Sequence, residues 1–178
     1  MSNDIVPDTK NWTWVLEERC ADCGFEASRF DVAQTGPAIR DIGQRWQGVL
    51  SRPDAMTRPR PDVWSPLEYG CHVRDVLRIF DVRLGLMIAE NGPHFANWDQ
   101  DATAVEDRYD LQEPAIVSAE LLAAANALAD HFDAISGDQW SRRGFRSDGT
   151  EFTVDSLARY LMHDPVHHLW DVQAAEAP

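Results

Sequence analysis

The sequence predicts an all-α protein: a four-helix bundle with at most one small hairpin before the last helix. Two observations predict this fold class. Four segments repeat apolar residues at three- and four-residue spacing, and no segment reads as a strong strand. The predicted helices lie near residues 32–51, 65–91, 114–136 and 153–174. The length of 178 residues suits one compact domain, so we expect an irregular N-terminal segment at 1–30 and the bundle at 31–178.

The first two helices have the clearest boundaries. The first buries Ile39, Ile42, Trp46 and Val49 on one face and ends at Ser51-Arg52-Pro53. The second begins at a capping box, in which the Ser65 hydroxyl accepts a free backbone N–H and Glu68 accepts the N–H of Ser65. Pro66 occupies the first helical position, where its missing N–H costs nothing.

The second half of the chain continues the pattern after a long acidic loop at about 93–113. A loop of this length is often functional, and it carries Trp98, which we expect to line a pocket. The third helix repeats apolar residues from Val117 to Ile135. Asp148-Gly149 then indicates a hairpin near 144–153, directly before the last helix.

The composition excludes several classes of function. Asp and Glu number 30 against 16 Lys and Arg, and the resulting net charge of −14 repels nucleic acids and anionic lipids. No segment approaches the ~18 apolar residues of a membrane span. Met1-Ser2-Asn3-Asp4 lacks the basic start of a signal peptide, so we expect a cytoplasmic protein. Its expected partners are a small-molecule substrate or thiol, with no nucleic acid or membrane, and we allow for a homodimer.

The strongest functional signal is a histidine cluster at 163–168. His163 and His167 are four residues apart on a helix, so they share a face and suit a single metal ion. Hydrogen-bonded or exposed histidines are the alternative. His168 is rotated away from this pair, and we do not expect it to join them. Pro165 removes one helical hydrogen bond between the two ligands, for which we expect a mild kink.

His72 on the second helix lies at the flank of the apolar face, where it points partly inward. A buried histidine bonded to a carbonyl is the alternative. Two histidines from one helix and one from another would leave the fourth position of a tetrahedral metal open, as catalytic zinc sites do. Glu68 and Asp171 are candidates to orient the imidazoles, with solvated surface carboxylates as the alternative.

The cysteines form a second candidate site. Cys20 and Cys23, followed by Gly24, look like half of a zinc knuckle, but the sequence shows no second cysteine pair. Three interpretations stay open: reduced packing cysteines, a dithiol redox pair and an irregular zinc site. Cys71, the third cysteine, is turned about 100° away from His72 on the same helix.

The chain resembles the DinB-like superfamily. The residues that carry the resemblance are Trp64-Ser65-Pro66-Leu67-Glu68-Tyr69-Gly70-Cys71-His72-Val73-Arg74-Asp75, Asn97 to Tyr109, and Tyr160-Leu161-Met162-His163-Asp164-Pro165-Val166-His167-His168. It covers about Asp31 to Val172 and implies a bundle in up-down-down-up order. It also implies a divalent metal held by His72, His163 and His167, and imidazole ligands suit zinc or nickel best. The N-terminal cysteine pair is outside the resemblance.

The superfamily includes metal-dependent thiol transferases such as mycothiol-dependent maleylpyruvate isomerase. The resemblance therefore implies a metal-dependent transferase or isomerase that uses a low-molecular-weight thiol, with mycothiol as the expected co-substrate. A metal in an open site would favour the thiolate, which then attacks an electrophilic substrate. The alternative is a non-catalytic metal-binding bundle with a stress-related or interaction role. The sequence assigns no catalytic residue.

Overall fold

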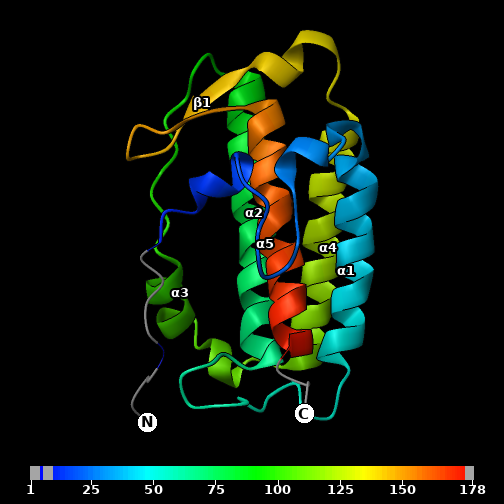
Figure 1. The fold of residues 1–178 in the computed structure, drawn as a ribbon. Coiled ribbons are helices and arrows are strands. Elements are labelled where there is room, and N and C mark those ends of the chain that lie inside the picture. Colours follow the sequence, from blue (N-terminus) through cyan, green and yellow to red (C-terminus); the bar gives the residue numbers. More distant parts are fainter. Residues whose placement is uncertain (1–4, 6–9, 175–178) are drawn as a thin grey trace.

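Four long helices build the fold in the computed structural model, which describes residue 5 and residues 10–174 (Figure 1). They are α1 (Thr35–Leu50), α2 (Pro66–Ala89), α4 (Pro114–Asp133) and α5 (Val154–Ala174). A hairpin of β1 (Arg143–Phe145) and β2 (Glu151–Thr153) precedes α5. The predicted fold class is confirmed. Residues 1–4, 6–9 and 175–178 lie outside the described residues, and they include the Met1-Ser2-Asn3-Asp4 start from which the absence of a signal peptide was predicted.

The direction of the helices follows the up-down-down-up order. Figure 1 shows α2 and α4 running in the same direction, opposite to α1 and α5. Two parallel helices need a connection as long as the bundle, and the segment between Ala89 and Pro114 supplies it along the outside. This segment contains a short helix that the sequence analysis treated as loop, α3 (Gln100–Glu106), whose start is capped by the side chain of Asp99.

Local sequence signals explain where α2 and α5 begin and continue. The Ser65 hydroxyl accepts the Glu68 N–H at 3.2 Å, and the Glu68 carboxylate accepts the Ser65 N–H at 2.8 Å, which is the predicted capping box. Helix α5 continues through Pro165, because tertiary packing outweighs the lost hydrogen bond.

The core lies between the four helices. Helix α1 packs on α4, α4 packs on α2, and α5 contacts both α1 and α2. The largest fully buried side chains come from all four helices and include Trp46, Leu77, Leu121 and Leu161. Each buried leucine stabilises the fold by roughly 1.5–3 kcal/mol relative to an exposed one. None of the helices among the described residues is long and apolar enough to span a membrane.

The N-terminal segment packs against α5. It contains the short 3₁₀ helices η1 (Trp12–Leu16) and η2 (Ala27–Arg29), and η3 (Val32–Gln34) leads into α1. The Arg159 guanidinium of α5 donates to the carbonyls of Ala27 and Phe30. Val15, Cys20 and Ala27 are each only 1% exposed, so the segment forms part of the packed structure.

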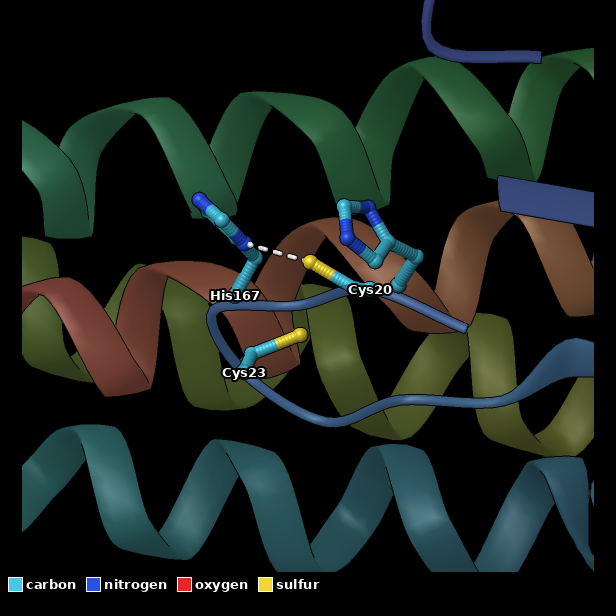
Figure 2. Close-up of side chains that lie close together, drawn as sticks. Cys20, Cys23 and His167 are labelled. Carbon is cyan, nitrogen blue, oxygen red and sulfur yellow. Dashed lines mark hydrogen bonds between the residues drawn. The ribbon is translucent and has the colours of Figure 1, made fainter. Parts of the chain in front are cut away.

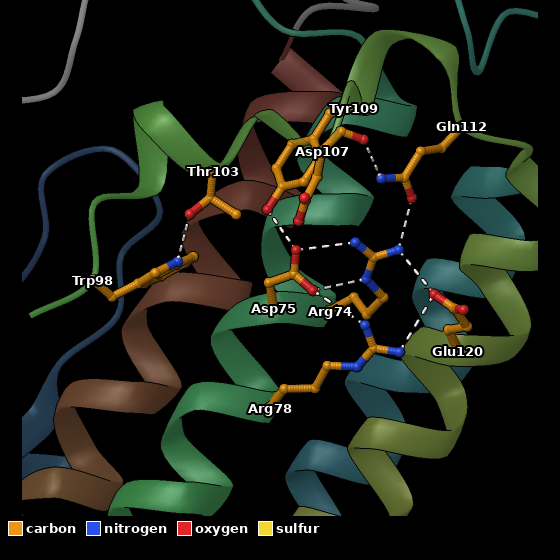
Figure 3. A network of polar contacts seen from close by, with 9 residues as sticks. All are labelled: Arg74, Asp75, Arg78, Trp98, Thr103, Asp107, Tyr109, Gln112 and Glu120. Carbon is orange, nitrogen blue, oxygen red and sulfur yellow. Dashed lines mark hydrogen bonds and ion pairs between the residues drawn. The ribbon is translucent and has the colours of Figure 1, made fainter. Parts of the chain in front are cut away.

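A polar network ties the long connection to α2 and α4 (Figure 3). The Asp75 carboxylate accepts hydrogen bonds from the Tyr109 hydroxyl at 2.5 Å and from Arg74 Nε at 2.9 Å. Arg74 also donates to Gln112 at 2.7 Å and Glu120 at 2.9 Å. Burial alone would raise the pKa of Asp75, but the hydrogen bonds from Arg74 and Tyr109 lower it below its usual value. The network therefore holds the connection in place beside the histidines of α2 and α5.

Candidate metal centres

Helix α5 carries two neighbouring rows of ligand side chains. His163 and His167 form one row, and Asp164 and His168 form the other, each with a spacing of four residues. Successive residues turn by about 100° around a helix, so the two rows lie on adjacent faces. The first row meets the N-terminal segment and the second meets α2. The predicted set of His72, His163 and His167 is thereby divided between two groups.

The first group joins His163 and His167 to the cysteine pair. One ligand atom from each of Cys20, Cys23, His163 and His167 lies within 4.8 Å of all the others. Cys20 Sγ is 3.6 Å from His167 Nδ1, and Figure 2 shows the two cysteines on the loop that passes this histidine. His163 is 5% exposed, and its buried Nε2 has no hydrogen-bond partner among the described residues.

The second group consists of His72, Asp164 and His168, whose ligand atoms also lie within 4.8 Å of one another. Asp164 Oδ2 is 3.3 Å from His72 Nε2 and 3.8 Å from His168 Nε2. His72 Nδ1 and Asp164 Oδ1 are buried and have no hydrogen-bond partner in the described part of the chain. Two imidazoles and a carboxylate are a donor set that fits a divalent transition metal.

The structure shows what surrounds each of the histidines singled out from the sequence. His168 is indeed rotated away from His163 and His167, but this rotation turns it toward α2, where its ring centroid is 4.8 Å from that of His72. His72 does not form one group with His163 and His167, because the N-terminal segment, not α2, covers the His163 face. Joint coordination of one metal by these three histidines stays a prediction. Asp164 was missed, although its spacing to His168 equals that of the predicted pair.

The proposed orienting carboxylates also differ from expectation. Asp171 Oδ2 is 2.8 Å from His168 Nδ1, whereas the distance from Asp171 Oδ1 to His167 Nε2 is 3.8 Å. Asp171 therefore orients His168, whose Nε2 lies 3.8 Å from Asp164 Oδ2. Glu68 does not orient His72, because its carboxylate caps α2 and pairs with Arg58.

The charges of the histidines on α5 and of Asp164 suit metal binding. Burial lowers the pKa of His163 to about 4, and it also lowers the pKa of His167. Burial would raise the pKa of Asp164, but the charges of His72 and His168 lower it to about 2. At neutral pH His163 and His167 are thus neutral and Asp164 is ionised, as metal ligands must be. Burial and the neighbouring Cys20 thiol raise the pKa of Cys23 to about 11.

A cavity of about 920 Å³ lies beside the two groups. Its wall includes Asp164 and His168 together with the aromatic residues Trp12, Trp64, Tyr69 and Trp98. Trp98 stacks on His72, with 5.6 Å between ring centroids and 16° between planes. The long connection thus lines the pocket, as expected from its length.

Arg83 is a partly buried cation on the cavity wall. Among the described residues Arg83 forms no ion pair; its guanidinium lies 5.2 Å from the Phe80 ring centroid and 5.5 Å from that of Phe95. Burial lowers its pKa. Arg74 and Arg159, by contrast, are both occupied by structural contacts. Arg83 is therefore the better candidate to receive a substrate anion.

Comparison with known proteins agrees with this architecture. The fold is similar to that of YfiT from Bacillus subtilis, which is described as a probable metal-dependent hydrolase with an unusual four-helix bundle topology. The TM-score is 0.67 at 16% sequence identity, over 84% of this chain and 86% of that chain, so the likeness concerns the fold. No curated protein sequence matches significantly. The model of the DinB superfamily matches residues 40–172, and the chain therefore belongs to the DinB superfamily.

Proposed function

We propose that this protein is a metal-dependent enzyme whose catalytic metal is held by His72, Asp164 and His168. The observation that supports the proposal is a three-residue donor set of which two members, Asp164 and His168, line a large cavity. Three protein ligands leave a coordination position open, as in catalytic zinc sites. Because Asp164 and His168 lie on the face of α5 that meets α2, we propose this set in place of the triad expected from the sequence.

The residues around the metal each have a physical role in this proposal. Bound zinc or nickel supplies Lewis acidity, which favours the deprotonated form of a nucleophile near neutral pH. Asp164 supplies negative charge, and Asp171 fixes the orientation of His168. Trp98 covers His72 and limits the access of water to that side. Arg83 offers a positive charge to an anionic substrate in the cavity.

The proposed nucleophile is a low-molecular-weight thiol, with mycothiol as the first candidate, and the reaction is a thiol transfer or a thiol-dependent isomerisation. The cavity volume is at the upper end of the ~300–1,000 Å³ of small-molecule pockets, which gives room for a thiol and a second substrate. Cys71 is unsuited as a protein nucleophile because it is fully buried and burial raises its pKa to about 12. The thiol must then come from solution.

Hydrolysis is a second candidate, favoured by the donor set itself. Two histidines and one carboxylate are the protein ligands of several zinc hydrolases, in which water occupies the open position. The description of YfiT as a probable metal-dependent hydrolase points the same way. A non-catalytic metal-binding bundle with a stress-related role would bind the metal but turn over neither class of substrate.

The test combines metal analysis with a cobalt spectrum. Replacement of the native metal by cobalt, followed by a panel of bacterial low-molecular-weight thiols, should give a new thiolate-to-metal absorption band with the correct thiol. His72→Ala should remove that new band, whereas His131→Ala, an exposed histidine on α4, should keep it. Ester or amide hydrolysis without a thiol-induced band would favour the hydrolase. A His72→Ala variant with unchanged metal content would overturn the assignment of the centre.

A further inference from the structure

We infer that Cys20, Cys23, His163 and His167 form a second metal site, a closed zinc site that fastens the N-terminal segment to α5. The two donor sets share no residue, so this site can be tested separately from the proposed catalytic centre. Its role is structural: it fixes one wall of the cavity.

The distances are close to those of a tetrahedral zinc site. Zinc–sulfur bonds of ~2.3 Å and zinc–nitrogen bonds of ~2.0–2.1 Å place neighbouring ligand atoms about 3.3–3.8 Å apart. Cys20 Sγ and His167 Nδ1 already lie 3.6 Å apart, and the whole set is within 4.8 Å. Rotamer adjustments of about 1 Å would bring the four atoms to zinc-binding distance.

The loop that carries the cysteines reverses direction between them. The Cys20 carbonyl accepts the Gly24 N–H at 3.0 Å, and the Cys20 N–H donates to the Phe25 carbonyl at 2.9 Å. Gly24 has a φ of +75°, a conformation that glycine adopts without strain. This turn directs both thiols to the same side, toward His167 (Figure 2). The loop thus acts as the cysteine half of a zinc site.

Helix α5 supplies the histidine half. A two-residue gap between the cysteines and a three-residue gap between the histidines are the spacings of Cys₂His₂ zinc sites. The sequence did not show this pairing because Cys20 and His167 are 147 residues apart. Buried His163 Nε2, which no described residue contacts by a hydrogen bond, is a polar atom that a metal would satisfy.

Aromatic side chains surround the four ligands. The Trp12 ring centroid lies 5.4 Å from those of both His163 and His167, and the Phe25 ring centroid lies 6.0 Å from that of His163. Cys20 is 1% exposed. Four protein ligands in such surroundings leave no position for a substrate, which is the property of structural zinc sites. Since Trp12 also lines the cavity, the site links metal binding to the shape of the pocket.

A dithiol redox pair is the competing interpretation of the same cysteines. A disulfide between Cys20 and Cys23 would consume both thiolates and leave His163 and His167 without their metal. The two interpretations therefore differ in metal content and in the oxidation state of the purified protein, and both quantities are directly measurable.

The test uses the full-length protein purified under reducing conditions with zinc in the medium. Elemental analysis should find a tightly held zinc that an organomercurial thiol reagent releases. Cys20→Ser, Cys23→Ser and His163→Ala should each lose this one equivalent, whereas His72→Ala and Cys71→Ala should keep it. Limited proteolysis should cut residues 10–30 much faster in the first three variants, while circular dichroism stays helical.

Cobalt gives a readout that does not depend on activity or stability. The cobalt protein should show the intense visible bands of a tetrahedral site with thiolate ligands before any thiol is added, and Cys23→Ser should abolish them. Equal zinc content in wild type and the double variant Cys20→Ser/Cys23→Ser would overturn the inference. So would a Cys20–Cys23 disulfide found by mass spectrometry in zinc-free protein from the cell. A failure of the proposed catalytic centre would be seen separately, because the His72→Ala variant would then have the same total metal content as the wild type.

Discussion

Asp171 Oδ2 lies 2.8 Å from His168 Nδ1, three residues earlier on the same helix. A carboxylate in this position holds the imidazole in one tautomer and leaves Nε2 to face the metal. We predict that Asp171→Ala weakens metal binding at the His72–Asp164–His168 centre by about 10–100-fold. Competition with a chromophoric chelator measures this affinity.

The matched control for this prediction is Asp155→Ala at the start of α5, which pairs with Arg159 and lies outside both metal groups. It should leave the metal affinity unchanged. An Asp171→Ala variant that binds metal like the wild type would show that His168 is oriented by its packing alone.

The metal-free protein should lose stability as the pH falls from about 6.5 to about 4. Burial lowers the folded-state pKa of His163 to about 4. The nearby positive charges of His167 and His168 also lower this pKa, whereas the negative charges of Asp164 and Asp171 raise it. An unfolded histidine titrates near ~6.5. Between these values the unfolded state binds more protons, so the free energy of unfolding decreases on acidification, by at most about 3 kcal/mol from this group.

Urea unfolding of chelator-treated protein at pH 7, 6 and 5 measures this dependence. His163→Gln, which cannot titrate, should show a smaller decrease over the same interval. Equal pH dependence in the variant and the wild type would show that other groups account for the loss.

Tyr109→Phe should destabilise the protein by about 1–2 kcal/mol, because it removes a buried hydrogen bond to a carboxylate. The Tyr109 hydroxyl donates to Asp75 at 2.5 Å and joins the long connection to α2. Thermal unfolding followed by circular dichroism measures the change. Asp110→Asn, which removes only an exposed pair with Arg108, should change little, and a similar loss in both variants would contradict the network's role.

Arg83→Gln should weaken the binding of an anionic substrate by about 10–100-fold, the value of a hydrogen bond to a charged group. The expected signature is a higher KM with a nearly unchanged kcat, because Arg83 lies on the cavity wall and is not among the metal ligands. Arg45→Gln, an exposed arginine on α1, is the control. An unchanged KM would remove Arg83 from the substrate site.

The sequence was sufficient for the bundle because its helices have local signals. The capping box at Ser65 and Glu68 marks the start of α2, and the turn at Asp148-Gly149 marks the hairpin. Helix α3 was missed because it buries none of its seven residues and so has no apolar face for the sequence to reveal. The N-cap residue of α3, Asp99, cannot be told from an ordinary loop residue in the sequence.

The site was harder to predict, since spacing on a helix does not say what covers each face. His163 with His167 and Asp164 with His168 are equally good pairs by spacing alone. Only the packing of the N-terminal segment on one face and α2 on the other decides which partners each pair meets. The sequence therefore found the histidines on α5 and the rotation of His168 away from the first pair, but it did not show that this rotation brings His168 to His72.

The spacing of ligands along α5 couples the two proposed metal centres to each other. Deletion of one residue between Asp164 and His167 would rotate the rest of the helix by about 100°. His168 would then stand four residues after His163 and enter the cysteine site, while the site on α2 would lose its second imidazole. A change of length at this point cannot be repaired at one centre alone.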